Sequence, residues 1–258
     1  MFSEERREKI LEQVESLGRV LAKDLAQKYG VSIDSIRRDL SIMEDEGLLK
    51  RTHGGAIPHP KARNKPQHRL NRYGEGDVRQ HSIAKVAVQY IKADETVFFG
   101  GSSIHYVMLK YIPKNVAFTV VTNSVEIAYQ LRDFANVETY LIGGMVKSSG
   151  NITDSLANEC AKQFTVDVNF ATAGGLSTRG LSLATPEVAI FHQTILTNAR
   201  LNIVLIESFK IGSDLFAGMT SPLSKLDLVI TDDEAIEDKI EQLHSNGVKT
   251  IIAEREDH

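Results

Sequence analysis

The sequence predicts an α/β protein in which a small winged helix-turn-helix domain precedes a larger domain with a Rossmann-like, mostly parallel sheet. Segments with apolar residues at helical spacing cover most of the first fifty positions, and a tight turn separates two of the helices that they predict. From Val78 onward, strand-like and helix-like runs alternate, which favours a parallel sheet with helices on both faces. The expected parts are residues 1–57, a basic linker over residues 58–75, and residues 76–258.

Three helices are expected in the first domain. Ile10, Val14 and Leu17 recur at spacings of four and three, which is one apolar face of a helix. Gly30 is a C-cap for the second helix, and Ser32 is an N-cap for the third. Val20 and Leu21 are expected to form a brief extended segment. The predicted helices cover residues 4–16, 22–29 and 33–46.

The third helix has two different faces. One is apolar, with Ile36, Leu40 and Met43, and the opposite one carries Asp34, Arg38 and Ser41, flanked by Ser35 and Arg37. A helix of this kind after a tight turn can lie in the major groove of DNA, where arginine contacts guanine in bidentate fashion. A generic three-helix bundle with charged outer faces is the alternative interpretation.

A short hairpin, or wing, is expected after this helix. It runs from Leu48 to Thr52 and turns at Gly54-Gly55, and it places Lys50 and Arg51 near DNA phosphates. The predicted DNA-binding residues are Ser32, Asp34, Ser35, Arg37, Arg38, Ser41, Lys50, Arg51 and His53.

These motifs resemble a known family. The segments VSIDSIRRDL (31–40), EGLL (46–49) and RTHGGA (51–56) closely resemble the N-terminal signature of the DeoR family of bacterial transcription regulators. Ser35 stands where the family usually has threonine, and the hydroxyl is kept. The signature covers about the first fifth of the chain. The resemblance implies a repressor.

Charge is unevenly distributed along the chain. Residues 1–72 hold 15 Lys and Arg against 11 Asp and Glu, whereas residues 73–258 hold 15 against 23. No acidic residue occurs between Gly47 and Gly74, and prolines punctuate the same stretch. A polyanion partner for the first part is one interpretation, and a solvated, passive tether is the other. We favour a tether that also contacts the DNA backbone.

The second domain is expected to contain a series of strands separated by helices. The expected strands are residues 96–99, 118–122, 138–142, 168–173, 203–206, 228–230 and 250–253. Glycines and hydroxyl residues gather where these strands end, and in parallel sheets ligands bind at the carboxyl ends of strands. Gly101-Ser102-Ser103, at the start of a helix, suits a phosphate. No loop has a Walker or GxGxxG pattern, so a nucleotide is not indicated.

The family resemblance extends into this domain. Gly101-Ser102-Ser103 resembles the family's Gly-Thr-Thr loop, and Thr122-Asn123 resembles its Thr-Asn strand end. The resemblance implies a fold related to sugar-phosphate isomerases and a domain that binds a phosphorylated sugar. The implied effector-binding residues are Gly101, Ser102, Ser103, Asn123, Lys147, Gly175, Glu187 and Lys210. Residues that depart from the family pattern are Phe99, Thr172, Gly174, Phe191, Glu207 and Phe209. Because carboxylates are lost among them, a deoxy sugar phosphate is one hypothesis.

The leading hypothesis is a transcriptional repressor of a carbohydrate-catabolism operon, not an enzyme, with double-stranded operator DNA and a phosphorylated sugar effector as partners. A homo-oligomer, dimer or tetramer, is expected because paired half-sites need paired recognition helices. An isomerase-like enzyme with Glu187 or Glu207 as base is the alternative, and a nonspecific DNA-coating protein is a third hypothesis.

Composition and the ends of the chain indicate where the protein works. The single Cys160 excludes an internal disulfide and is expected to fill space in a helix, with a reactive thiol as the minor alternative. The charged start MFSEERREKI is not a signal peptide, and no apolar run approaches ~20 residues. The histidines show no metal-site spacing, so neither a cofactor nor a metal is expected. A cytoplasmic location and no membrane partner are expected.

Overall fold

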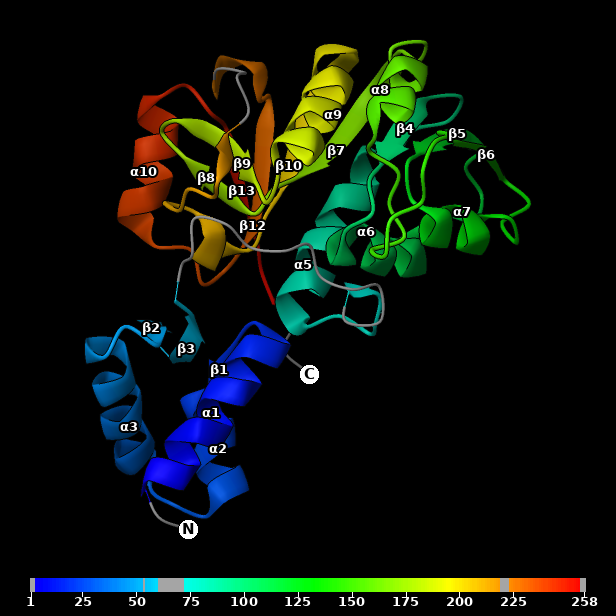
Figure 1. The fold of residues 1–258 in the computed structure, drawn as a ribbon. Coiled ribbons are helices and arrows are strands. Elements are labelled where there is room, and N and C mark those ends of the chain that lie inside the picture. The colour runs from blue at the N-terminus through cyan, green and yellow to red at the C-terminus, as the bar shows by residue number, and fades with distance from the viewer. Residues whose placement is uncertain (1–2, 53, 60–71, 219–222, 256–258) are drawn as a thin grey trace. The chain divides into compact units, whose positions relative to one another are not determined.

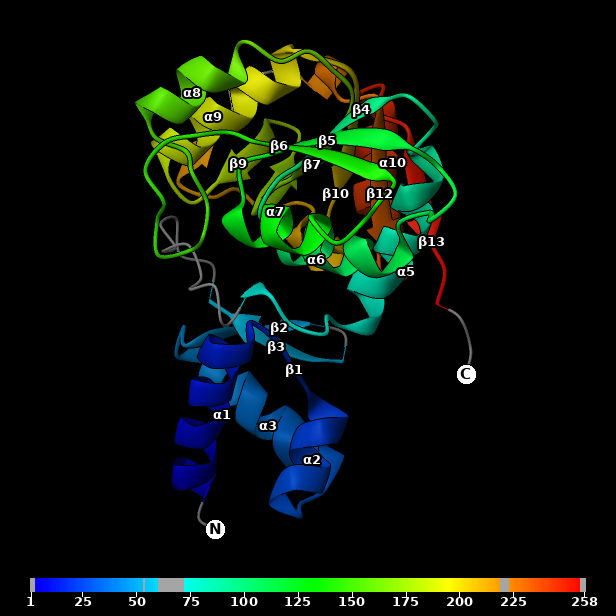
Figure 2. The same ribbon diagram turned by 90° about the vertical axis from the view of Figure 1, so that its right-hand side faces the viewer.

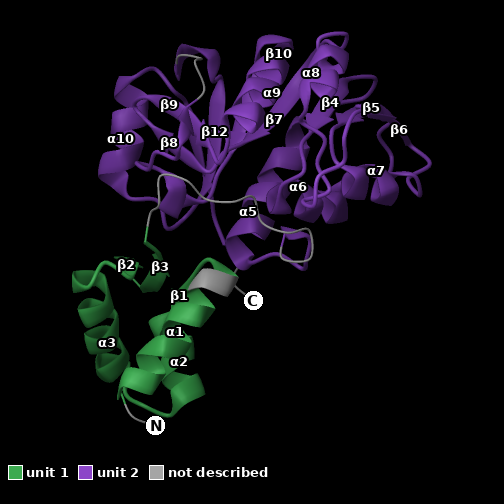
Figure 3. Ribbon diagram, viewed as in Figure 1, with its two compact units in different colours: residues 1–61 green, residues 62–258 purple. Residues whose placement is uncertain are grey.

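The structure is a computed structural model that describes residues 3–52, 54–59, 72–218 and 223–255. The chain forms two compact units, residues 1–61 and 62–258 (Figure 3). In the described part, no helix is long and apolar enough to cross a membrane.

Unit 1 is a winged helix-turn-helix. Its elements are α1 (Ser3–Leu17), β1 (Val20–Leu21), α2 (Ala22–Tyr29), α3 (Ile33–Asp45), β2 (Leu49–Thr52) and β3 (Gly55–Pro58). The three strands form an antiparallel sheet in the order β1-β3-β2. Gly55 has no room for a side chain, because a Cβ there would lie 1.8 Å from the carbonyl oxygen of Val20. The expected wing is therefore confirmed as the β2–β3 hairpin, and β1 joins it.

The turn between α2 and α3 forms as its residues predict. Gly30 adopts a left-handed conformation with φ 63°, which ends α2 without steric strain. Ser32 then caps α3, since its hydroxyl accepts a hydrogen bond from the backbone N–H of Ser35 at 3.1 Å. These two caps fix where the third helix begins.

The core of unit 1 is apolar apart from one buried ion pair. Ile36, Leu40 and Met43 are almost fully buried and pack with residues of α1 and the sheet. Arg6 of α1 donates from Nε to Oδ2 of Asp39 in α3 at 2.7 Å, and both residues are buried. Packing and this pair together set the orientation of α3 on α1.

Unit 2 is built on a seven-stranded sheet in which every neighbouring pair of strands is parallel (Figures 1 and 2). The strand order is β13-β12-β10-β7-β4-β5-β6. The strands are β4 (Thr96–Phe99), β5 (Phe118–Thr122), β6 (Val137–Leu141), β7 (Val166–Thr172), β10 (Ala199–Leu205), β12 (Leu228–Asp232) and β13 (Thr250–Ala253). The predicted α/β fold with a parallel sheet is confirmed.

Helices cover both faces of this sheet. They are α5 (Val78–Ala87), α6 (Ser103–Met108), α7 (Val125–Leu131), α8 (Ser155–Ala161), α9 (Pro186–Thr197) and α10 (Glu237–Ser245). Short 3-10 helices add η1 (Val88–Tyr90), η2 (Leu109–Tyr111), η3 (Ser208–Lys210) and η4 (Leu223–Lys225). Cys160, in α8, packs against the core as the sequence predicts.

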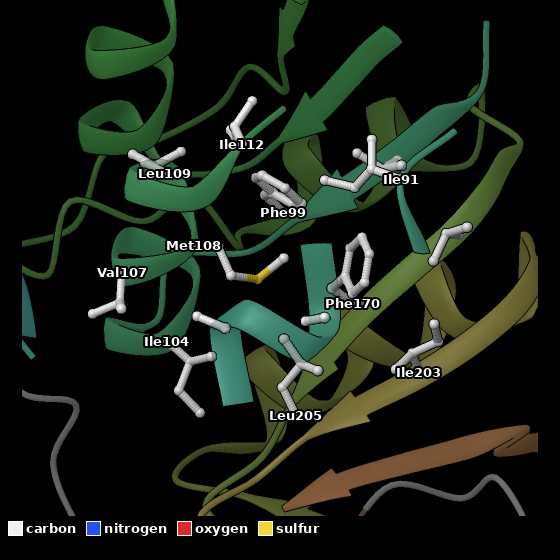
Figure 4. Close-up of a cluster of buried hydrophobic side chains, with 14 of the residues drawn as sticks. Ile91, Phe99, Ile104, Val107, Met108, Leu109, Ile112, Phe170, Ile203 and Leu205 are labelled. Atoms are coloured by element: carbon white, nitrogen blue, oxygen red, sulfur yellow. The ribbon is translucent and has the colours of Figure 1, made fainter. Parts of the chain in front are cut away.

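Successive residues of β4 supply two cores, as alternation along a strand requires. Val97 and Phe99 pack with α5, α6 and α7 on one face, together with Phe170 and Met108 (Figure 4). Phe98 points to the opposite face, where α8 and α9 pack. The chain leaves β4 toward β5 and β6 and then returns to β7 on the other side of β4. This reversal places a topological switch point between β4 and β7.

Two features of unit 2 differ from the sequence expectation. β10 begins at Ala199, four residues before the expected Ile203, because Asn202 is a buried strand residue that pairs with Asn169 of β7 at 2.9 Å. A small antiparallel sheet was not expected. It consists of β8 (Gly175–Ser177), β9 (Gly180–Leu183) and β11 (Ala217–Gly218), whose short, glycine-rich strands carry little periodicity.

Candidate DNA-binding and effector sites

The outer face of α3 carries exposed arginines. The side chains of Arg37 and Arg38 are both exposed, whereas Ile36 and Asp39 beside them in the sequence are buried. Arg37 forms an ion pair with Asp34 at 3.3 Å, and both side chains stay largely in solvent, so the pair constrains Arg37 only weakly. Within the described residues, Arg38 makes no ion pair. Its guanidinium is available to a ligand outside unit 1.

The wing is held to α3 by two hydrogen bonds. The backbone N–H of Arg51 donates to Oε1 of Glu44 at 2.9 Å, and the Arg51 guanidinium donates to the hydroxyl of Ser41 at 3.2 Å. Lys50 is exposed on the same strand, β2. The predicted residue His53 lies outside the described residues. These hydrogen bonds hold Arg51 of the wing next to the outer face of α3.

A hollow of about 210 Å³ brings cations from three elements together. Arg37 of α3, Arg51 of β2 and Lys23 of α2 all line it, above an apolar floor that includes Ile33 and Leu40. The sequence analysis did not select Lys23, because its helix carried no motif. Its place near the start of the helix before the turn was the available signal.

The proposed basic linker is only partly visible. Residues 60–71, which contain most of its prolines and cations, lie outside the described residues. Arg72 and Tyr73, at the described end of the linker, contact loops of unit 2.

In unit 2, the β4–α6 loop carries three of the predicted effector residues. Ser102 caps α6, and its hydroxyl accepts from the backbone N–H of His105 at 3.2 Å. Nε2 of His105 lies 2.6 Å from the carbonyl oxygen of Phe170 and must donate to it, so Nδ1 accepts a hydrogen bond from the Ser102 hydroxyl at 2.9 Å. The Ser102 hydroxyl is thus occupied within the protein. Burial lowers the pKa of His105 to about 4, which keeps the ring neutral.

Ser103 belongs to a series of hydrogen bonds that links α6 to η3 through α5. Nε2 of Gln80, in α5, donates to the Ser103 hydroxyl and to Oε1 of Glu207, both at 3.0 Å. Lys210 donates to Oε2 of Glu207 at 2.5 Å. Burial alone would raise the pKa of Glu207, but the charge of Lys210 and the hydrogen bonds from Lys210 and Gln80 hold it below its usual range. Gln80 is a residue that the sequence analysis missed.

Lys147 and Glu187, two further predicted effector residues, lie together. Lys147 Nζ is 2.6 Å from Oε1 of Glu187, and the buried Thr153 hydroxyl donates to the same carboxylate at 3.3 Å. Asn123 is fully buried at the end of β5, where its amide donates to the carbonyl oxygen of Ile152 at 3.0 Å. Its own side-chain oxygen has no partner in the described structure.

The remaining predicted residue, Gly175, begins β8. A Cβ there would lie 2.3 Å from the carbonyl oxygen of Ser213, so close backbone packing requires glycine. The structure therefore gives Gly175 a packing role.

Two of the residues that depart from the family pattern are in the cores. Phe99 stacks on His105 and packs against Phe170, and Phe191 packs against Phe98. Both are fully buried, so neither contributes to a polar pocket wall. The ring of Phe209 contacts two cations, since Arg79 lies 5.1 Å and Lys210 lies 5.5 Å from its ring centre.

Two histidine rings flank Gly100, which follows β4. A Cβ on Gly100 would lie 3.3 Å from His105 and 3.4 Å from His192, so glycine leaves the loop room between them. Burial, and then the charge of Arg72, lower the pKa of His192. The β4–α6 loop is therefore the point where α5, α9 and the Arg72 segment meet.

Two sequence-family profiles match the chain. The DeoR-like helix-turn-helix domain matches residues 6–59, and the DeoR C terminal sensor domain matches residues 78–233. The second match alone covers more than half of the 258 residues.

Curated relatives match over almost their whole length. The HTH-type transcriptional repressor GlcR of Bacillus subtilis is 28% identical over 258 residues, which cover 100% of this chain and 99% of that protein. The HTH-type transcriptional regulator GlpR of Haloferax volcanii is 28% identical over 260 residues, with 97% and 98% covered. GolR of Listeria innocua, also an HTH-type transcriptional regulator, is 25% identical over 260 residues, with 98% and 100% covered.

Solved structures show more distant likenesses. The full-length sorbitol operon regulator SorC from Klebsiella pneumoniae aligns with a TM-score of 0.39 and 10% identity over 95% of this chain and 96% of that one. Ribose 5-phosphate isomerase A from Methanocaldococcus jannaschii aligns with a TM-score of 0.37 and 15% identity over 51% of this chain and 52% of that one. Similarity at this level carries no conclusion about ligands.

Proposed function

This chain belongs to the DeoR family of transcription regulators, and from that premise we propose that it represses a carbohydrate-catabolism operon under the control of a phosphorylated sugar. Unit 1 would bind operator DNA, and unit 2 would bind the sugar phosphate and thereby change the affinity for DNA. The two ligands must then affect each other's affinity by the same factor.

One observation carries the DNA-binding half of this proposal. Arg37 and Arg38 are exposed on a helix whose opposite face is buried, and Arg51 of the wing lies with Lys23 and Arg37 around one hollow. An arginine on such a helix can read guanine in the major groove, while lysines beside it contact phosphates. The stability of a generic helical bundle does not require cations from three elements around one hollow.

The effector half is supported by the position of the polar residues. The β4–α6 loop lies beside the switch point of a parallel sheet, the usual place for a ligand in such folds. Ser103, Glu207 and Lys210 meet there through Gln80. Because Lys147 and Lys210 are each paired with a glutamate, a bound phosphate would share or replace these carboxylates as their partners.

An enzymatic alternative has little support from the same residues. A general base must be accessible and have a pKa near the working pH. Glu207 is buried, bonded to Lys210 and Gln80, and its pKa is held below its usual range. Turnover of a phosphorylated sugar by the purified protein would contradict this argument.

Genomic DNA capture with the purified full-length chain tests the DNA-binding proposal. On a captured site, Arg38→Ala and Arg37→Ala are each expected to weaken specific binding by ~1–3 kcal/mol. Lys9→Ala is a matched control, since Lys9 is an exposed cation on α1 that pairs with Glu5. Unchanged footprints in both arginine variants would contradict the assignment.

The genes beside the captured site then suggest which sugar phosphates to test. A sugar phosphate that releases the DNA from the wild-type protein at millimolar concentration or below would support the effector role. A homo-oligomer is part of the same proposal, because two-fold related half-sites require paired α3 helices.

A further inference from the structure

The first described residues of unit 2 are fastened to the loops of the candidate effector pocket. Arg72 NH1 donates to the carbonyl oxygen of Gly101, in the β4–α6 loop, at 2.5 Å. The Tyr73 hydroxyl lies 2.9 Å from the hydroxyl of Ser124, at the end of β5, and donates to Oδ1 of Asn151 at 3.1 Å. We call Arg72, Tyr73 and these three partners the clasp.

The clasp is packed as well as hydrogen-bonded. The ring of Tyr73 lies 5.2 Å from that of Tyr106 in α6, and burial raises the pKa of the Tyr73 phenol. Asn151 also donates from Nδ2 to the Gly101 carbonyl oxygen at 3.1 Å. Arg72 and Asn151 therefore share this acceptor in the β4–α6 loop. A Cβ on Gly101 would lie 1.8 Å from Asn151 Oδ1 and 2.7 Å from the Tyr73 hydroxyl. Glycine at this position therefore serves the clasp.

Arg72 makes the clasp sensitive to charge. Its guanidinium is partly buried, burial lowers its pKa, and within the described residues no carboxylate pairs with it. Its charge is felt by His105 and His192, which also lack a carboxylate partner there. A carbonyl oxygen is a weaker partner for a guanidinium than an anion is, so an anion at the β4–α6 loop would compete for Arg72.

We propose that the clasp transmits the state of the effector pocket to the DNA-binding unit, by gripping or releasing the end of the segment that joins the two units. This inference rests on the proposed function, because it assumes that an anionic effector binds beside Gly101. Arg72 and Tyr73 directly follow that joining segment in sequence. Their partners Gly101, Ser124 and Asn151 lie in loops at or beside the candidate effector residues. A ligand that moves those loops, or attracts Arg72, changes the grip without contacting unit 1.

Limited trypsin digestion of the full-length protein measures the grip directly. Trypsin cleaves after Arg72 only when it takes the guanidinium into its own specificity pocket, so Arg72 must first leave Gly101. Mass spectrometry identifies the fragment that begins at Tyr73. Tyr73→Phe removes the hydrogen bonds to Ser124 and Asn151 but keeps the ring, and cleavage after Arg72 is expected to accelerate about tenfold.

Two further variants provide a second test of the clasp and a control. Asn151→Ala weakens the clasp from the opposite side and is expected to accelerate the same cleavage. Tyr106→Phe is the matched control, because its phenol makes no hydrogen bond among the described residues while its ring packs on Tyr73. Its cleavage rate is expected to stay within twofold of wild type. Equal rates in wild type, Tyr73→Phe and Asn151→Ala would overturn the proposal.

The coupling itself is measured on captured operator DNA. Inorganic phosphate, glucose 6-phosphate, fructose 1-phosphate, fructose 6-phosphate, ribose 5-phosphate and glycerol 3-phosphate serve as probes. For a probe that changes the DNA Kd of the wild-type protein, Tyr73→Phe is expected to reduce that change at least fivefold. The variant should bind the probe without DNA no more than threefold more weakly than wild type, because a loosened clasp favours the anion.

The outcomes separate this inference from the function on which it rests. A wild-type protein that responds to no probe fails the proposed effector function, and the clasp as a ligand-coupled device fails with it. A wild-type response that Tyr73→Phe retains in full overturns the clasp alone. If probe affinity and coupling fall together, Tyr73 is a pocket residue and the proposal is wrong.

Discussion

The buried ion pair between Arg6 and Asp39 allows a quantitative prediction for unit 1. Both residues are nearly inaccessible, with relative exposures of 8% and 3%, and their side chains meet at 2.7 Å. Asp39→Ala would leave the guanidinium buried without its carboxylate, which typically costs ~3–5 kcal/mol. We therefore expect α1 and α3 to separate far more readily in this variant, although neither DNA-contacting arginine is changed.

Hydrogen exchange by mass spectrometry on the full-length protein measures this cost locally. A loss of ~3–5 kcal/mol corresponds to exchange that is roughly 10²–10⁴-fold faster in peptides from α1 and α3. Peptides from β4 and β7 provide the internal reference. Asp34→Ala is the matched control, because Asp34 is an exposed carboxylate on the same helix and its pair with Arg37 is worth ~0.5 kcal/mol or less.

A double variant separates the charge effect from packing. Arg6→Met with Asp39→Leu removes both charges and fills similar space, so exchange should return to within about tenfold of wild type. Exchange in α3 that changes less than tenfold in Asp39→Ala would refute the reasoning. So would an equal increase in β4 and β7, because the effect would then not be local to unit 1.

Three other predictions follow from single sites. Lys50→Ala and Lys23→Ala should each reduce the slope of log K against log salt by about one and weaken binding to all DNA sequences alike. Gel-shift titrations at several salt concentrations measure this slope. An unchanged slope would mean that the lysine makes no phosphate contact. Gly55→Ala should lower the melting temperature because its Cβ meets the Val20 carbonyl at 1.8 Å, whereas Gly54→Ala, with nothing closer than 4.0 Å, should change it little. Because the pKa of His105 falls to about 4 in the folded protein, its contribution to stability is complete above the unfolded value of about 6.5 and is lost as pH falls from there to about 4. His192 loses stability over the same range in both proteins, so the total loss in urea titrations should be roughly 3 kcal/mol smaller in His105→Asn than in wild type. An identical pH profile in the variant would contradict this account.

Local signals explain how much of the fold the sequence predicts. In unit 1, Gly30 and Ser32 determine their own conformations through a left-handed φ and a side-chain cap, and both act within a few residues. In unit 2, apolar runs mark central strands such as β4, β5 and β12, which are largely buried. In β10, Asn202 interrupts the apolar run, and its partners are Asn169 of the neighbouring strand and the carbonyl oxygen of Leu196.

The candidate effector site was harder to predict because its contacts join residues that are far apart in the sequence. The sequence placed small and polar residues at the ends of strands, but it could not indicate which of them bond to one another. Ser102 bonds to His105, and Lys210 bonds to Glu207, so both are already engaged by partners within the protein. Gln80 and Arg72 join the same loop from segments outside any expected strand end, and no local pattern marks such long-range contacts.

The distribution of charge at this sheet edge bears on how an anion would act there. Lys147 and Lys210 each have a glutamate within 2.6 Å, so a phosphate gains little from them unless it displaces a carboxylate. Arg72 has only neutral partners among the described residues, the Gly101 carbonyl oxygen and the Tyr73 phenol, and burial lowers its pKa, so its charge is poorly compensated. The largest change in interaction on adding an anion would therefore fall on Arg72. A binding site whose least compensated cation lies on the segment leading to the other unit is suited to regulation, because ligand affinity and the position of that segment depend on the same group.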